Sequence, residues 1–183
     1  MAEFFPRHTV EWHLHEPAAF RRLSLSLAGM AVTAGVAIRV YRWLYLGFSS
    51  SDSWWVLIAA FAAGATILLG LATAHLGNYP VKHWVWRAPA FGAITGIAES
   101  AASAALIAAG VERLGTQVAH WSDWQSMALQ ATLRDIIAVS LFALVLAGVV
   151  QVVRYALLRR EHRDSTAIAV HEDHEAITHP RQL

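Results

Sequence analysis

The 183-residue sequence contains no cysteine, which excludes disulfides, thiolate metal sites and cysteine nucleophiles. Charged residues are also scarce, at 15% of the chain against 56% for hydrophobic residues. With a mean hydropathy of +0.42, this balance is far from that of a soluble protein and typical of a polytopic membrane protein. The apolar stretches leave no room for a separate soluble domain.

Four apolar stretches are each long enough to cross a bilayer. A transmembrane helix needs about 20 mostly apolar residues to span a hydrocarbon core of about 30 Å. The predicted spans are Leu23–Phe48, Trp54–Ala74, Ala90–Val111 and Ile136–Val153. They predict an all-α fold of four transmembrane helices, arranged as two helical hairpins within residues 23–158. A soluble four-helix bundle would need polar outer faces, and Ser53–Ala74 has none.

Lysine and arginine gather on one side of these spans, and short cytoplasmic loops carry an excess of both. Ten of the 14 basic residues lie before the first span, between the second and third, or after the fourth. These are Arg7, Arg21, Arg22, Lys82, Arg87, Arg154, Arg159, Arg160, Arg163 and Arg181. Both termini are therefore predicted to be cytoplasmic. The first span is expected to serve as an uncleaved anchor, and the short loops favour a bacterial inner membrane.

Two segments flank the predicted transmembrane domain. Residues 1–22 mix aromatic, histidine and basic side chains, and are expected to lie at the headgroup region on the cytoplasmic side. Residues 159–183 are polar, with few large apolar groups, and are expected to form a disordered cytoplasmic tail.

Small residues recur along the third span. In lipid no hydrophobic force drives helices together, so small side chains that let backbones approach are the usual means of association. The predicted packing residues are Gly92, Gly96, Ser100, Ser103 and Ala104. We therefore expect the third span to lie at the centre of a tightly packed bundle.

Five charged residues are the intramembrane candidates. Glu99 is in the middle of the third span, and its predicted partner is Arg39 in the first. Arg42 follows one turn after Arg39, while Arg134 and Asp135 open the fourth span, where Asp135 is a candidate partner for Arg42. A charge at bilayer depth costs about 2.5–3.5 kcal/mol and marks an ion or proton path or a buried pair. The sequence leaves a structural ion network and a functional pathway both open.

Histidine is unusually frequent, with ten residues. Haem bound within the membrane would need imidazoles at span depth, whereas these histidines lie at or beyond the span ends, so no cofactor is predicted. In the tail, His171 and His174 lie among carboxylates and are weak candidates for binding a divalent transition metal.

The sequence is compatible with two main classes of function. The first is a small channel or transporter component, homo-oligomeric, with Glu99 and Arg39 in its permeation or proton-coupling route. The alternative is a non-catalytic accessory or assembly subunit of a larger membrane complex. No catalytic cluster is evident, so an enzyme is the third choice. The predicted partners are the lipid bilayer and either further copies or another membrane subunit, without nucleic acid. The transported species is not indicated.

The first prediction concerns topology. Reporter fusions at position 183 and within the 112–123 loop should give opposite signals, because the basic residues place these sites on opposite sides of the membrane. The comparison needs two reporters, one active in the cytoplasm and one active outside it. Signals from the same side would contradict four spans.

Overall fold

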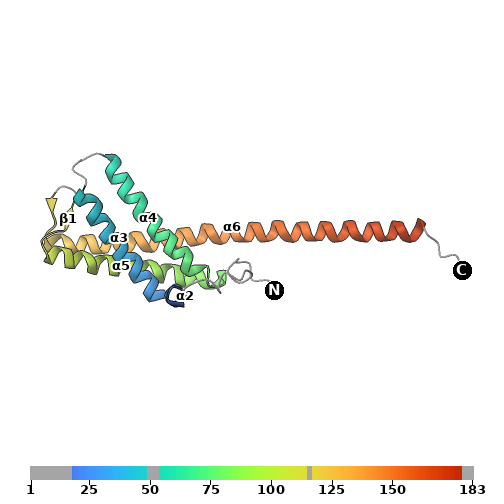
Figure 1. Cartoon of the computed structure of the whole chain (residues 1–183), viewed down its shortest axis with the longest axis horizontal. Coiled ribbons are helices and arrows are strands. Elements are labelled where there is room, and N and C mark those ends of the chain that lie inside the picture. Colours follow the sequence, from blue (N-terminus) through green and yellow to red (C-terminus); the bar gives the residue numbers. More distant parts are fainter. Residues whose placement is uncertain (1–17, 49–53, 115–116, 179–183) are drawn as a thin grey trace. The chain divides into compact units, whose positions relative to one another are not determined.

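The chain is α-helical in its computed structural model, which describes the backbone of residues 18–48, 54–114 and 117–178 and most side chains up to Arg159 (Figure 1). The α-helices are α2 (Ala18–Leu25), α3 (Leu27–Phe48), α4 (Trp54–Leu76), α5 (Trp84–Ala108) and α6 (Trp121–Thr178). A 3-10 turn, η2 (Val81–His83), precedes α5. Strands β1 (Arg113–Leu114) and β2 (Gln117–Val118) pair antiparallel in the loop before α6. The predicted all-α class is confirmed.

The chain divides into two units. The first comprises residues 1–144 and, in its described part, contains α2 to α5 and the beginning of α6. The second comprises residues 145–183 and contains the rest of α6. All the contacts considered below lie within the first unit.

Three helical segments in the described part of the chain are long and apolar enough to cross a membrane: Trp54–Leu76, Val81–Ala108 and Trp121–Arg159. The helix α3 is not among them. Its 22 residues are long enough, but Arg39 and Arg42 interrupt its apolar sequence. A multi-pass membrane protein is therefore supported, while the fourth span and the orientation stay predictions.

The predicted first span, Leu23–Phe48, is divided in the structure. Ser26 separates α2 from α3, and its Oγ accepts a hydrogen bond of 3.0 Å from the backbone N–H of Gly29. A serine hydroxyl bonded to an amide at the third helical position is a typical N-cap, since it satisfies a donor that has no partner inside the helix. The hydropathy of the sequence does not reveal this break, because apolar residues continue on both sides of Ser26.

The helices α5 and α6 both begin before their predicted spans. The predicted start at Ala90 followed Pro89, yet α5 begins at Trp84 and contains this proline. Likewise α6 begins at Trp121, where the Asp123 carboxylate accepts a 3.0 Å hydrogen bond from the His120 backbone N–H. A carboxylate that reaches back to the N-cap amide stabilises a helix start.

From α3 onward, helices that follow one another in the chain run in alternating directions (Figure 1), so α3 and α5 run the same way, and α5 packs against both α3 and the first part of α6. A side chain at Gly35 of α3 would collide with the α5 backbone at Thr95. Side chains at Gly92 and Gly96 would collide with the α6 backbone near Asp135 and Thr132. The helix α5 is also the most buried of the three long apolar segments. Three glycines thus set the distances between these helices.

Large apolar side chains face outward while charged ones are buried. On α4, Trp54 and Trp55 are more than 70% exposed and Phe61 is 58% exposed, whereas Glu99 and Asp135 are each 1% exposed. In water this arrangement would be unfavourable, and extended apolar surface indicates contact with lipid or with other proteins. Polar groups inside and apolar groups outside are what a bilayer requires.

The two predicted flanking segments are only partly described. Residues 1–17 of the predicted N-terminal segment lie outside the described residues. The backbone is helical to Thr178, so most of the segment 159–183 has helical backbone, while its side chains beyond Arg159 are not described. The disordered state predicted for this tail stays a prediction.

The second prediction tests the contact between α5 and α6. Gly96→Leu should destabilise the protein, because the new side chain meets the α6 backbone at Thr132 and over-packing typically costs about 1–3 kcal/mol. Gly70→Leu on α4 is the matched control, since nothing lies within 4 Å of a Cβ built there. Thermal unfolding in detergent measures both. Equal stability of the two variants would show that the glycine face of α5 does not hold the bundle.

Candidate functional site

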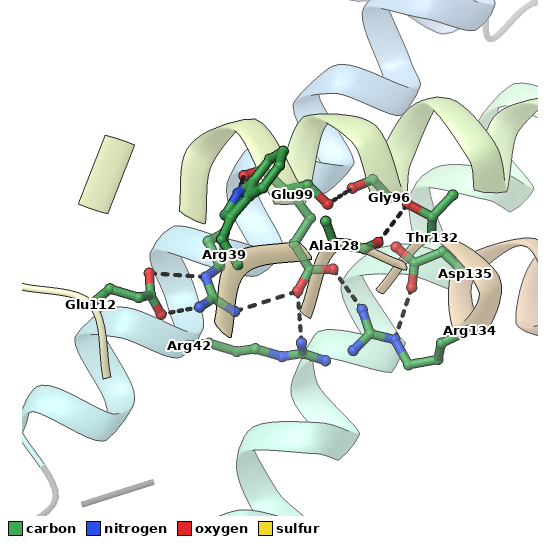
Figure 2. A network of polar contacts seen from close by, with 11 residues as sticks. Arg39, Arg42, Gly96, Glu99, Glu112, Ala128, Thr132, Arg134 and Asp135 are labelled. Carbon is green, nitrogen blue, oxygen red and sulfur yellow. Dashed lines mark hydrogen bonds and ion pairs between the residues drawn. The ribbon is translucent and has the colours of Figure 1, made fainter. Parts of the chain in front are cut away.

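Glu99 is the centre of a group of charged side chains inside the first unit (Figure 2). One carboxylate oxygen lies 2.7 Å from Nη1 of Arg42 on α3 and 3.8 Å from Nη1 of Arg39. The other oxygen lies 2.5 Å from Nη2 of Arg134 on α6. One buried carboxylate on α5 therefore joins three helices, and the predicted buried Glu–Arg pairing is confirmed.

The two outer arginines each have a second carboxylate. Arg39 is held by Glu112 through two parallel contacts, of which Nε to Oε2 measures 3.2 Å. Arg134 Nε donates to Oδ1 of Asp135 at 3.0 Å. Three guanidinium groups thus meet three carboxylates, so the formal charges cancel. We call this set the charge network: Arg39, Arg42, Glu99, Glu112, Arg134 and Asp135.

The turn after α5 positions Glu112. Gly110 has a φ of +69°, the left-handed conformation that glycine adopts without strain. The backbone N–H of Val111 donates to Leu106 and that of Gly110 to Ile107, which is the Schellman arrangement that ends many helices. The Glu112 carbonyl then accepts from Ala119 N–H at 3.0 Å, across the β1–β2 hairpin. The reversed chain brings Glu112, 3% exposed, back over the bundle.

The predicted pair Arg39–Glu99 is present, and both residues have further partners. Arg39 reaches Glu99 at 3.8 Å, but its hydrogen bonds go to Glu112, and Arg42 bonds Glu99 where Asp135 had been the candidate. The additional contact of Arg42 with Glu99 follows from the depth of the two residues. With α5 starting at Trp84 and α3 at Leu27, Glu99 and Arg42 each lie fifteen residues after the helix start, about 22 Å along it.

Glu112 was missed because it lies beyond the predicted third span. Charge balance is the signal that could have found it. The five predicted candidates comprise three arginines and only two carboxylates, Glu99 and Asp135, so one further acid is needed to neutralise the group.

The predicted packing residues occupy the buried side of α5, except that Ala104 is half-buried. Ser100 Oγ donates to the Gly96 carbonyl at 2.7 Å, and the Ser100 carbonyl accepts from Nε1 of Trp124 at 3.0 Å. Ser103 is buried, and its Oγ has no hydrogen-bond partner within the described residues. The polar groups on this face bond chiefly to backbone, which leaves the charge network as the site of unusual chemistry.

A cavity of about 110 Å³ adjoins the charge network between α3, α4 and α6. Its walls are Ile38, Arg42, Phe61, Gly64, Ala65, Leu68, Leu69, Arg134, Asp135 and Ala138. Among these wall residues, the Arg134 side chain is 32% exposed and Phe61 is 58% exposed. Oδ2 of Asp135 is buried and has no hydrogen-bond partner among the described residues. An apolar cavity with a few polar groups at one end is the usual form of a small-molecule site.

A second polar cluster joins α2, α4 and α5. His75 is fully buried, with Nδ1 2.9 Å from the Ser24 carbonyl and Nε2 3.2 Å from Nη1 of Arg87. Because the carbonyl can only accept and the guanidinium can only donate, Nδ1 carries the hydrogen and the imidazole is neutral. Arg87 also stacks on Tyr79, whose hydroxyl donates to Leu25. In the sequence, only the basic and aromatic run Lys82–Arg87 pointed to a polar contact in this region. Nothing in that run indicated that His75 is buried against Arg87.

Metal and cofactor candidates find no support in the described part of the chain. No group of three or more His, Asp or Glu side chains there could hold a metal ion. The tail candidates His171 and His174 lie where side chains are not described.

Comparison with protein-family models, with curated proteins and with solved structures finds no significant match to this chain. What can be stated of its class comes from its own residues. It is a helical protein with three candidate membrane spans and buried salt bridges between arginine and glutamate.

The third prediction tests the charge network. Glu99→Gln should destabilise the protein by about 3–5 kcal/mol, because Arg42 and Arg134 lose their shared carboxylate while remaining largely buried. Adding Arg42→Gln should recover part of the loss, since the double variant restores neutrality. Unfolding by denaturant in mixed micelles measures both. A double variant as unstable as the two single changes combined would show that these residues do not interact.

Proposed function

We propose that this protein is a small integral membrane transport protein, a channel or a transporter component, with four spans and both termini in the cytoplasm. The cavity between α3, α4 and α6 lies on the route of the transported species. The observation that carries the proposal is the polar wall of this cavity, where Arg42, Arg134 and Asp135 border a space otherwise lined by apolar side chains.

The free-energy cost of burying these charged side chains supports a functional role for the charge network. Six ionisable groups lie in or beside helices that are apolar enough for a membrane, and buried ion pairs are seldom more stable than well-packed apolar replacements. A bundle held only by packing would use the glycine contacts of α5 alone. Charged side chains that face a cavity inside a membrane protein usually mark a pathway for ions or protons.

The second candidate is an accessory or assembly subunit. Its support is the outer face of α6, where large apolar side chains are exposed at intervals of about one turn: Leu129, Leu133, Ile137 and Leu141. Lipid or a partner helix can cover such a face. The charge network favours transport over this alternative, because Glu99 already has its cationic partners within the chain and needs none from another subunit. Mass measurement in native lipid would identify co-purifying subunits and count the copies.

The fourth prediction is a flux measurement in proteoliposomes. Wild-type protein should dissipate gradients of small ions, followed with entrapped dyes over a range of pH. Gly64→Val should reduce this flux at least tenfold, because it adds three carbons beside Arg42 and fills the cavity without changing a charge. Gly70→Val, on the same helix but in open space, is the matched control and should conduct like the wild type.

Two results would contradict the proposal. One is folded wild-type protein that conducts no ion under any gradient. The other is equal flux through Gly64→Val and wild type, which would remove the cavity from the route. Either would leave the accessory role as the better account of the chain.

A further inference from the structure

We propose that the end of the first unit where α2, α4 and α5 meet binds the phosphate of an anionic phospholipid, with Arg87 and Lys82 as its cationic contacts. This inference is independent of the proposed transport function and involves no residue of the charge network. The observations that carry it are an arginine held by uncharged groups, a lack of acidic side chains among the described residues of this end, and exposed apolar side chains beside the basic ones.

The contacts of Arg87 within the described structure are with uncharged groups. Its Nη1 lies 3.2 Å from Nε2 of the neutral His75, and its Cζ lies 3.4 Å from the ring centroid of Tyr79 and 4.6 Å from that of Trp86. Aromatic faces attract a guanidinium but do not neutralise its charge. Each arginine of the charge network is paired with a carboxylate. Among the described residues, Arg87 has no such partner.

Part of the Arg87 guanidinium is open to a ligand from outside the bundle. The side chain is partly exposed, and its Nη2 has no hydrogen-bond partner within the described residues. Its Nε is buried, so a ligand meets the guanidinium at its Nη2 end. A phosphate oxygen accepts a charge-assisted hydrogen bond from such a donor, and these are stronger than bonds between neutral groups.

Acidic side chains are missing from the part of the first unit that surrounds Arg87. The described ranges 18–48, 54–98 and 136–144 contain neither aspartate nor glutamate. The nearest carboxylate on the same helix is Glu99, which follows Arg87 by twelve residues, about 18 Å along α5. The charge of this end is therefore left for an anionic group from outside the described chain to balance.

Three elements bring basic side chains to this end. The Ser24 carbonyl of α2 is bonded to His75 of α4, which in turn contacts Arg87 of α5. Arg22 lies in the last turn of α2, two residues before Ser24, and Lys82 lies in η2. Both Arg22 and Lys82 are exposed. Basic pockets between membrane helices at a membrane surface bind the phosphates of anionic lipids.

The position of this end along the helices matches that of lipid headgroups. The candidate span Trp54–Leu76 ends here, and the candidate span Val81–Ala108 begins here. In the first turn of α5, Val85 is 82% exposed and Trp86 is 52% exposed. Tryptophan at the end of a span lies at the level of the headgroups. A lipid whose phosphate contacts the basic side chains therefore meets apolar surface with its acyl chains, whereas a free phosphate gains nothing from that surface.

The charges of this end favour anionic over zwitterionic headgroups. Phosphatidylcholine carries an ammonium group beside its phosphate, and no carboxylate is present in the described part of this end to pair with it. Aromatic rings also bind such cations, but those of Tyr79 and Trp86 already contact Arg87. Phosphatidylglycerol presents the same phosphate with an uncharged glycerol. It is the class of lipid that this site fits.

The fifth prediction is tested by native mass spectrometry of the full chain, released from micelles that contain equal amounts of phosphatidylglycerol and phosphatidylcholine with identical acyl chains. The protein should retain phosphatidylglycerol. Lys82→Gln should weaken its binding about fivefold, the loss expected for one basic residue at a membrane surface. Arg87→Gln should weaken it further, because it removes the guanidinium. Arg154→Gln, the same change of charge at an exposed residue of α6, is the matched control and should bind like the wild type.

Three results would overturn the inference. They are equal retention of the two lipids, equal affinity of Lys82→Gln and Arg154→Gln for phosphatidylglycerol, and displacement of the lipid by an equal concentration of inorganic phosphate. The last result would make the ligand a free phosphate. If Arg87→Gln does not fold, Lys82→Gln decides the question, because Lys82 is exposed and has no hydrogen bond within the described residues.

Discussion

The contact on which this structure depends is the salt bridge of one carboxylate, Glu99, with arginines from two neighbouring helices (Figure 2). In a bilayer the helices gain nothing by hiding apolar surface from one another, so association needs close packing or polar contacts. Glu99 lies on the central helix, Arg42 on α3 and Arg134 on α6. Each arginine would be far more costly alone in lipid than paired. Neutralising these charges therefore requires the three helices to be together.

The glycine contacts and the charge network support each other. The Glu99 carboxylate can meet guanidiniums on both sides only if the α5 backbone lies close to α3 and α6. Gly35 permits the first approach, and Gly92 with Gly96 permits the second. Packing alone would allow helices to rotate about their axes, whereas hydrogen bonds of 2.5–2.7 Å set which faces meet. The small residues thus let the helices approach closely, and the charged contacts determine which helix faces meet.

The sequence predicts the parts of this arrangement that follow from local pattern. Long apolar runs located α4, α5 and α6, and a carboxylate amid small residues identified Glu99 as buried. Features that depend on backbone geometry could not be predicted from the sequence pattern. The Ser26 cap that divides the first span, and the turn at Gly110 that returns Glu112 to the bundle, leave no mark in hydropathy. The contact of Arg42 with Glu99 was not predicted for the same reason, because the register between helices depends on where each helix begins.

The charge network and the cavity share three side chains, those of Arg42, Arg134 and Asp135. Arg42 uses one nitrogen for Glu99 and turns its remaining edge to the cavity. A change at the cavity wall would therefore act on the contacts of Arg42 and Arg134 with Glu99, so the shape of the cavity and the association of α5 with α3 and α6 depend on one set of charges.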